Sequence, residues 1–329
     1  MPLLKKSQIS KRMGEHIPVL YNEVIEGLNI KPDGIYVDLT VGRGGHSSGI
    51  LTKLTTGRLI AVDQDLDAIE ASKVRLAKIS NNFVVRRANF SKIEDILEEE
   101  NAEEVDGILM DLGVSSPQFD EGERGFSYRE DATLDMRMDQ RNPLTAYQII
   151  NSYSLQELTQ IFKNYGEEKF AYSIAKNIIK SREVTPIETT YQLVEIIKMS
   201  KPMKELNKKG HPAKQVFQAL RIAVNDELNV LETTLTRALR HLKPGGRLAV
   251  ITFHSGEDRI VKNIFKDASV VVGNRFDGPN VPTEKPYILI NNKPIVASKA
   301  ELESNHRAAS AKLRIIARKK GDTNYGHER

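Results

Sequence analysis

Three aspartates in the first part of the chain each end a short apolar run, and these are the first candidates for chemistry. They are Asp38, Asp63 and Asp111. If the runs are strands of one parallel sheet, all three carboxylates lie at the carboxyl ends of the strands. Open α/β sheets bind their ligands at that edge. Three carboxylates at one edge are much less expected by chance than one, so we predict a ligand site there.

A glycine turn follows the first of these aspartates. Gly42, Gly44 and Gly45 lie where residues without a Cβ let the backbone approach a ligand closely. Ser47 or Ser48 can cap the helix that comes next. A strand, a glycine turn and a helix start together form a ligand cradle in doubly wound α/β folds.

The cradle does not identify its ligand. A dinucleotide fingerprint has glycines at the first, third and sixth positions, and Ser47 stands at the sixth position here. Asp63, at the tip of the second strand, can accept both hydroxyl hydrogens of an adenosine ribose. That role serves NAD and S-adenosylmethionine equally. An ordinary strand–turn–helix with a surface aspartate is a third interpretation of the same residues.

Strands and helices alternate through the first 118 residues, which predicts right-handed crossovers and a parallel sheet. The expected fold class is therefore α/β, with a doubly wound, Rossmann-like sheet. The expected strands are residues 35–38, 58–62, 83–85, 106–111 and 247–253. Two more strands, 287–290 and 313–317, could form an antiparallel pair at the edge of the sheet.

Helical patterns without strands begin at about residue 119. Ser154 and Glu157 have the spacing of a capping box, and apolar stripes follow on the next helices. We therefore expect an inserted helical domain at 119–211, within a main domain made of residues 1–118 and 212–329. A long helix from about Lys214 to His241 should lead back into the sheet.

The charge balance is only mildly basic, with 48 lysines and arginines against 44 acids and a net charge of +4. Nucleic-acid binding must therefore be argued from local clusters. Six lysines and one acid lie between Lys198 and Lys214, with no aromatic residue among them. A solvated linker and a phosphate-contacting surface both remain open for this segment. A second basic cluster comprises Lys312, Arg314, Arg318, Lys319 and Lys320.

Several classes of protein are excluded or disfavoured. The chain has no cysteine, so it has neither disulfides nor thiol catalysis, and we expect a cytoplasmic protein. No signal peptide, membrane span or metal-ligand spacing is recognisable. His254, Ser255 and Asp258 suggest a hydrolase, but the nucleophile-elbow spacing is absent. A structural or RNA-facing role is the better interpretation of that segment.

The motifs assembled in this way resemble the bacterial small-subunit rRNA cytosine-N4 methyltransferases, over nearly the whole chain and in order. They are residues 16–20, 38–46, 111–118, 124–127, 134–138, 211–213, 217–225 and 253–255. The sequence departs from the family pattern at Leu39, at Gly256 and within 305–310. These departures concern the turn after His254 and the last basic patch.

The resemblance implies a class I methyltransferase sheet with S-adenosylmethionine as the methyl donor. It carries the family's cofactor contacts onto Gly44, Gly45, His46, Asp63, Phe90, Asp111 and Gln118. Asp111 is also the candidate acceptor for the amino hydrogens of the cytosine, in a catalytic role. The implied partner is small-subunit rRNA or the 30S particle, held by the inserted domain and the two basic clusters. No membrane is involved, and a homodimer is left open.

Overall fold

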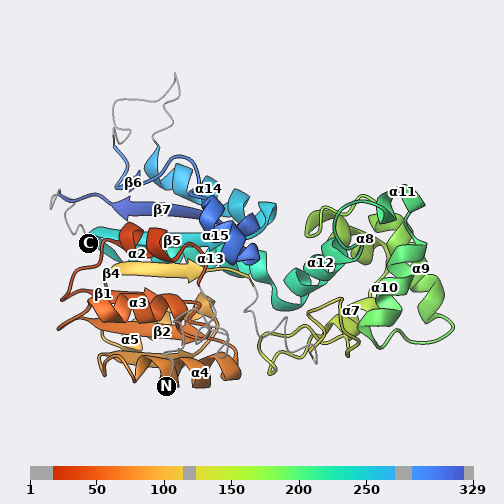
Figure 1. The fold of residues 1–329 in the computed structure, drawn as a ribbon, viewed down its shortest axis with the longest axis horizontal. Coiled ribbons are helices and arrows are strands. Elements are labelled where there is room, and N and C mark those ends of the chain that lie inside the picture. Colours follow the sequence, from red (N-terminus) through yellow and green to blue (C-terminus); the bar gives the residue numbers. More distant parts are fainter. Residues whose placement is uncertain (1–17, 114–123, 271–283, 322–329) are drawn as a thin grey trace, which may run out of the picture. The chain divides into compact units, whose positions relative to one another are not determined.

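The computed structural model describes residues 18–113, 124–270 and 284–321 (Figure 1). The chain divides into two compact units, one formed by residues 1–113 and 232–329 and the other by residues 114–231. The second unit thus continues past residue 211, where the sequence analysis had ended the insertion. The reason is the apolar face of the helix that begins at Lys214, because its residues Val216, Phe217 and Leu220 are buried in the core of the helical unit.

The first unit is built on a seven-stranded sheet with the order β3-β2-β1-β4-β5-β7-β6. The strands are β1 (Ile35–Asp38), β2 (Arg58–Asp63), β3 (Phe83–Arg87), β4 (Val105–Asp111), β5 (Leu242–Thr252), β6 (Tyr287–Leu289) and β7 (Lys312–Arg318). The first five are parallel, and β7 runs antiparallel to both β5 and β6. The doubly wound sheet and the antiparallel pair at its edge are both confirmed.

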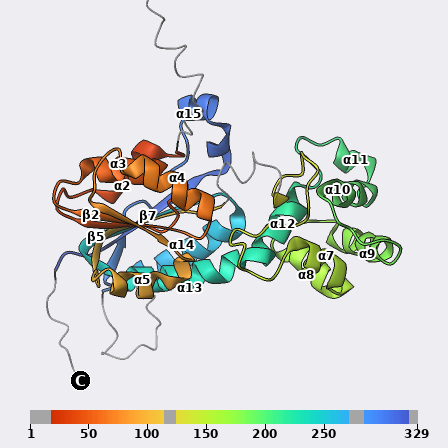
Figure 2. The same cartoon turned by 90° about the horizontal axis from the view of Figure 1, so that it is seen from below.

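Helices cover both faces of this sheet, and its central strands β1 and β4 are accordingly buried along almost their whole length. In Figure 2, α2, α3 and α4 lie on one side of the sheet and α5 and α14 on the other. The helices of this unit are α2 (Tyr21–Leu28), α3 (Gly45–Lys53), α4 (Leu66–Leu76), α5 (Ile93–Glu99), α14 (Ser255–Ser269) and α15 (Lys299–Ser304), with the short 3-10 turns η1 (Phe90–Lys92) and η3 (His306–Ser310). No helix of the described ranges is long and apolar enough to cross a membrane.

The second unit has its own apolar core, formed by the inward faces of its helices. They are α7 (Ala146–Ser152), α8 (Leu155–Asn164), α9 (Ala171–Arg182), α10 (Thr190–Met199), α11 (Met203–Leu206) and α12 (Lys214–Asn225). The capping box of Ser154 and Glu157 is present at the start of α8, as predicted. Phe162, Ile174 and Ile178 are fully buried in this core, which confirms that the apolar stripes are packing surfaces.

The expected long helix from Lys214 to His241 is two helices. α12 ends at Asn225, and α13 (Glu227–Arg240) begins after Asp226, whose φ of 50° is left-handed. Aspartate tolerates this conformation better than most residues, and its side chain accepts a hydrogen bond from Asn229 (2.6 Å). Sequence periodicity cannot reveal such a break, because one left-handed residue leaves the apolar pattern on both sides intact.

Candidate cofactor site

The glycine turn between β1 and α3 has the backbone that its residues predicted. Gly42 and Gly44 have positive φ values of 50° and 77°, which residues with a Cβ rarely adopt. Gly45 is required for a different reason, since a Cβ there would lie 2.5 Å from Cγ of Pro18. The turn is therefore fixed partly by its own conformation and partly by packing against the segment before α2.

Asp38 joins the strand end to the following helix. Its carboxylate accepts hydrogen bonds from Oγ of Ser47 (2.6 Å) and from the backbone N–H of Thr40 (3.1 Å). Ser47 therefore uses the sixth position of the turn for a side-chain hydrogen bond, where a dinucleotide fingerprint would have glycine. Burial raises the pKa of Asp38 to about 6, and the negative charge of Asp63 acts in the same direction.

Asp63 braces the same turn from the end of β2. Its Oδ2 accepts from the backbone N–H of Gly42 (2.9 Å), and its Oδ1 accepts from that of Asp65 (3.0 Å). Each carboxylate oxygen can accept a further hydrogen bond, so ribose hydroxyls remain possible donors. Burial nevertheless raises the pKa of Asp63 to about 6.

Asp111, at the end of β4, is the least satisfied of the three acids. Its backbone N–H donates to Oγ1 of Thr40 (2.6 Å), which fixes the strand end beside the turn after β1. Its Oδ1 is buried and has no hydrogen-bond partner within the described residues. Burial, followed by the negative charges of Asp38 and Glu257, raises the pKa of Asp111 to about 8.

His46 lies beside this carboxylate in a fixed orientation. Its Nε2 is 2.9 Å from the carbonyl oxygen of Val19, which can only accept, so Nε2 carries a hydrogen. Its Nδ1 then faces Oδ2 of Asp111 at 3.5 Å. The imidazole is 5% exposed and lies parallel to the ring of Tyr21 at a centroid distance of 6.2 Å. The pair His46–Asp111 can therefore share one proton.

Phe90 follows β3 and begins the 3-10 turn η1, whose cap is Asn89. The Nδ2 of Asn89 donates to Oε1 of Gln64 (2.9 Å) and so links the turn after β3 to the turn after β2. The sequence analysis missed this link and the role of Thr40, although all three residues closely follow strand ends. Gln118, the remaining predicted contact, lies outside the described residues.

The segment that suggested a hydrolase has a structural role. His254 caps the start of α14, and the side chain of Glu257 completes the capping box. Oε2 of Glu257 also accepts a hydrogen bond from the backbone N–H of Phe253 (2.7 Å). Asp258 binds Arg314 (2.8 Å) and Lys312 (3.3 Å). Much of the second basic cluster is therefore neutralised by acids, because Arg318 and Lys319 also pair, with Glu104 and Glu284.

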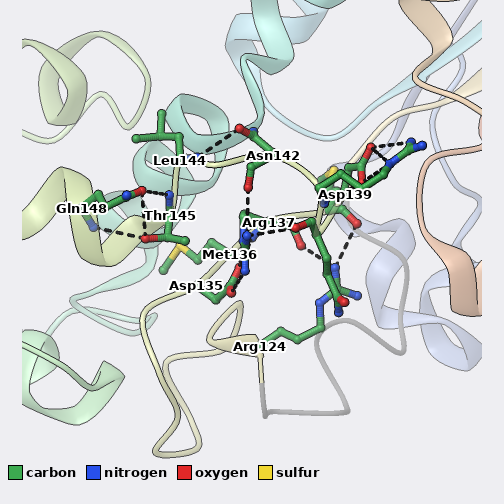
Figure 3. Close-up of polar contacts among 12 residues, drawn as sticks. Arg124, Asp135, Met136, Arg137, Asp139, Asn142, Leu144, Thr145 and Gln148 are labelled. Carbon is green, nitrogen blue, oxygen red and sulfur yellow. Dashed lines mark hydrogen bonds and ion pairs between the residues drawn. The ribbon is translucent and has the colours of Figure 1, made fainter.

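Two further motifs form a braced loop in the second unit (Figure 3). Arg137 binds both carboxylate oxygens of Asp135 (2.9 and 2.8 Å) and donates to the carbonyl oxygens of residues 140 and 142. Arg124 donates to the carbonyls of Arg137 and Met138. Asn225 of α12 donates to the carbonyl of Met136 (2.9 Å) and accepts from the N–H of Met138 (2.8 Å). This loop is a scaffold whose charges are balanced within itself.

The acids at the sheet edge suit one of the two adenosine cofactors better than the other. The negative charge of Asp63 raises the pKa of Asp38, and that of Asp38 raises the pKa of Asp111, so the strand ends carry several neighbouring carboxyl groups. S-adenosylmethionine brings a positive sulfonium and a positive ammonium group to such a pocket, whereas NAD brings a negative pyrophosphate. The fold and the site together define a class I methyltransferase that uses S-adenosylmethionine.

The comparison with known proteins gives the family. The sequence profile of the MraW methylase family matches residues 13–319, and the chain belongs to this family. Ribosomal RNA small subunit methyltransferase H of Mesoplasma florum is 54% identical over 312 residues, which cover 93% of this chain and 100% of that protein. The protein of the same name from Exiguobacterium sibiricum is 52% identical over 310 residues, 94% of this chain and 99% of that protein. S-adenosylmethionine is accordingly the cofactor.

Proposed function

We propose that this chain transfers a methyl group from S-adenosylmethionine to the exocyclic N4 of a cytosine in small-subunit rRNA. The names of its relatives and the sequence motifs described above support this substrate. The observation that carries the chemistry is the buried acidic edge of the sheet, above all the unpartnered Oδ1 of Asp111.

Seven residues hold the cofactor in this proposal. Gly44 and Gly45 shape the turn that holds its methionyl part, Asp63 accepts from the ribose hydroxyls, and Phe90 offers an apolar face to the adenine. His46 and Asp111 face the remaining polar groups, and Gln118, which lies outside the described residues, is expected to hydrogen-bond the cofactor. When bound, S-adenosylmethionine supplies a methyl carbon on positively charged sulfur, open to in-line displacement.

The acceptor needs help from the protein, because the lone pair of cytosine N4 is delocalised into the ring. An oxygen that accepts one amino hydrogen draws this lone pair out and then takes the proton that N4 loses. Oδ1 of Asp111 serves as that acceptor. His46 orients the carboxyl from the other side, where its Nδ1 faces Oδ2 at 3.5 Å, and shares the proton.

The inserted domain, predicted at 119–211, recognises the RNA. A cytosine in structured RNA must be unstacked before N4 can reach an enclosed site, and this requires contacts to the RNA on both sides of the base. The partner is the small-subunit rRNA, free or within the 30S particle, in the cytoplasm.

Two measurements on the full chain test this function. Labelled methyl groups should be transferred to small subunits from a strain that lacks the gene, and mass spectrometry should locate them on N4 of one cytosine. Calorimetry should show S-adenosylmethionine binding that Asp63→Ala weakens about 10- to 150-fold, the range for hydrogen bonds to a charged group. Asp139→Ala, which removes a carboxylate of the second unit, is the matched control and should bind normally. Failure to methylate any ribosomal substrate would overturn the proposal.

A further inference from the structure

The lysine-rich segment 198–214 has no aromatic residue of its own, but the fold brings one to it. The ring of Tyr128 stacks on the imidazole of His211 at a centroid distance of 4.2 Å and an interplanar angle of 11°. Tyr128 also meets Phe217 edge-on, at 5.7 Å and 89°. Since Phe217 is buried in the core of the second unit, the stacked pair is anchored from beneath. Both rings of the pair are half-buried and therefore partly open to solvent.

Three positively charged side chains act on the imidazole of this pair. Burial, and then the charges of Lys198, Arg129 and Lys201, lower the pKa of His211 below its ordinary 6.5. Arg129 is exposed, and the side chain of Lys198 is 42% exposed. Lys198 pairs with Glu195 of its own helix, an exposed ion pair of the kind that contributes little stability.

Lys201 has a different role from its neighbours. Its side chain is 6% exposed, and its Nζ donates to the buried carboxylate of Glu168 (2.6 Å) and to the carbonyl of Pro212 (2.7 Å). The ion pair therefore ties the segment that carries His211 to the start of α9. This tether holds the imidazole in place, whereas Lys198 and Arg129 remain accessible to a ligand.

We propose that the Tyr128–His211 stack, with Lys198 and Arg129 beside it, is a binding surface for single-stranded RNA. A base stacks on the open ring surface, and the neighbouring cations contact the phosphates. Aromatic platforms within positive charge are the usual means of holding single strands. This inference rests on the proposed function and states where the second unit holds the substrate.

The absence of tryptophan from the chain allows a direct test. Tyr128→Trp introduces a single fluorescent reporter into the stack, and Tyr147→Trp introduces one at an exposed tyrosine of α7. A short single-stranded RNA should quench the reporter at 128 and leave the reporter at 147 unchanged. No quenching at 128 at RNA concentrations that saturate binding, or equal quenching at both positions, would overturn the proposal.

Affinity measurements separate stacking from charge. His211→Ala should weaken binding of the same oligonucleotide about 5- to 150-fold and leave its salt dependence unchanged. Lys198→Gln should reduce the slope of log affinity against log salt by about 0.7, the value for one phosphate contact on a single strand. Lys180→Gln on α9 is the matched control. Equal affinities and slopes for His211→Ala, Lys198→Gln and the control would contradict the assignment.

The two proposals can fail separately. Calorimetry with S-adenosylmethionine and methylation of small subunits test the enzyme without reference to this surface. If both succeed while the reporter and the two variants give no response, only the surface is wrong. If the reporter responds to a mixture of small-subunit proteins and not to the oligonucleotide, the assignment to RNA is overturned.

Discussion

Asp135 of the second unit and Asp111 at the sheet edge of the first unit are held in opposite ways. In the second unit, burial alone would raise the pKa of Asp135, but hydrogen bonds from Arg137 outweigh it and keep that pKa below its usual value. In the first unit, burial raises the pKa of Asp111 to about 8, and the negative charges of Asp38 and Glu257 add to the shift. An acid with its own arginine fixes the shape of a loop, whereas acids that face one another are available to a positively charged ligand.

The arrangement at the sheet edge lowers the stability of the cofactor-free protein, and this is common at functional sites. Binding of a cation removes the repulsion between the carboxylates. The free energy released in this way contributes to the affinity for the cation. The braced loop around Asp135 and Arg137 in the second unit has no such repulsion that a ligand could relieve. Its ion pairs should matter for folding and leave cofactor affinity unchanged, and four predictions test this contrast.

The largest effect is expected from Arg137→Ala. The change leaves the Asp135 carboxylate without its cation and leaves the carbonyls of residues 140 and 142 without donors. We expect the free energy of unfolding to fall by about 3 kcal/mol, measured by urea denaturation. Affinity for S-adenosylmethionine should be unchanged in the folded variant. A loss of affinity without a loss of stability would reverse the roles assigned to the two regions.

Asp111→Asn should have the opposite effect on stability. An acid with a higher pKa in the folded than in the unfolded protein loses stability as the pH rises, here from about 3.8 to about 8. The cofactor-free variant should therefore be more stable than the parent at pH 8, and about equally stable near pH 4. Denaturation at both pH values measures this difference. A variant that is less stable than the parent at pH 8 would show that the folded protein stabilises the ionised carboxylate of Asp111, and would contradict the prediction.

Cofactor affinity should rise with pH between 6 and 8. The pKa of Asp111 lies at about 8 in the free protein, and a cation bound beside it displaces its proton. The expected slope approaches tenfold per pH unit, because one proton is released. Calorimetry in buffers of different ionisation enthalpy counts that proton. S-adenosylhomocysteine, which lacks the sulfonium charge, should show a smaller slope, and a flat profile for both ligands would refute the idea.

The smallest effect is expected from Arg141→Ala. Arg141 binds Asp139 in the same bidentate manner as Arg137 binds Asp135, but its side chain is 60% exposed. An exposed ion pair contributes little to stability, so the unfolding free energy should change far less than in Arg137→Ala. If Arg141→Ala and Arg137→Ala destabilise the protein equally, the stability of the loop depends on its ion pairs alone. The hydrogen bonds from Arg137 to the backbone carbonyls would then contribute nothing further.

The sheet and its acidic edge could be predicted from the sequence because their signals are local. An apolar run that ends in Asp38, Asp63 or Asp111 can be recognised without knowing what surrounds it. The parallel arrangement then follows from the alternation of strands and helices. The same reasoning located the glycine turn, although it did not anticipate that Gly45 is required by Pro18.

The partners of these residues could not be predicted, because they come from distant parts of the chain. Nothing in the sequence links His46 to the carbonyl of Val19, or Tyr128 to His211. The end of the helical unit was placed too early for a related reason. An amphipathic helix shows that it has an apolar face, but it does not show which core that face enters.

The position of the helical unit between β4 and β5 has a consequence for how the chain is made. β4 ends at Asp111, and β5 begins only at Leu242, so a nascent chain emerges with one side of its central strand unpaired until the helical unit is complete. The helical unit, whose contacts are local, can fold during that interval. β6 and β7 follow β5 in the chain, and β7 lies between β5 and β6 in the sheet, so β6 can join the sheet only after β7 has been made.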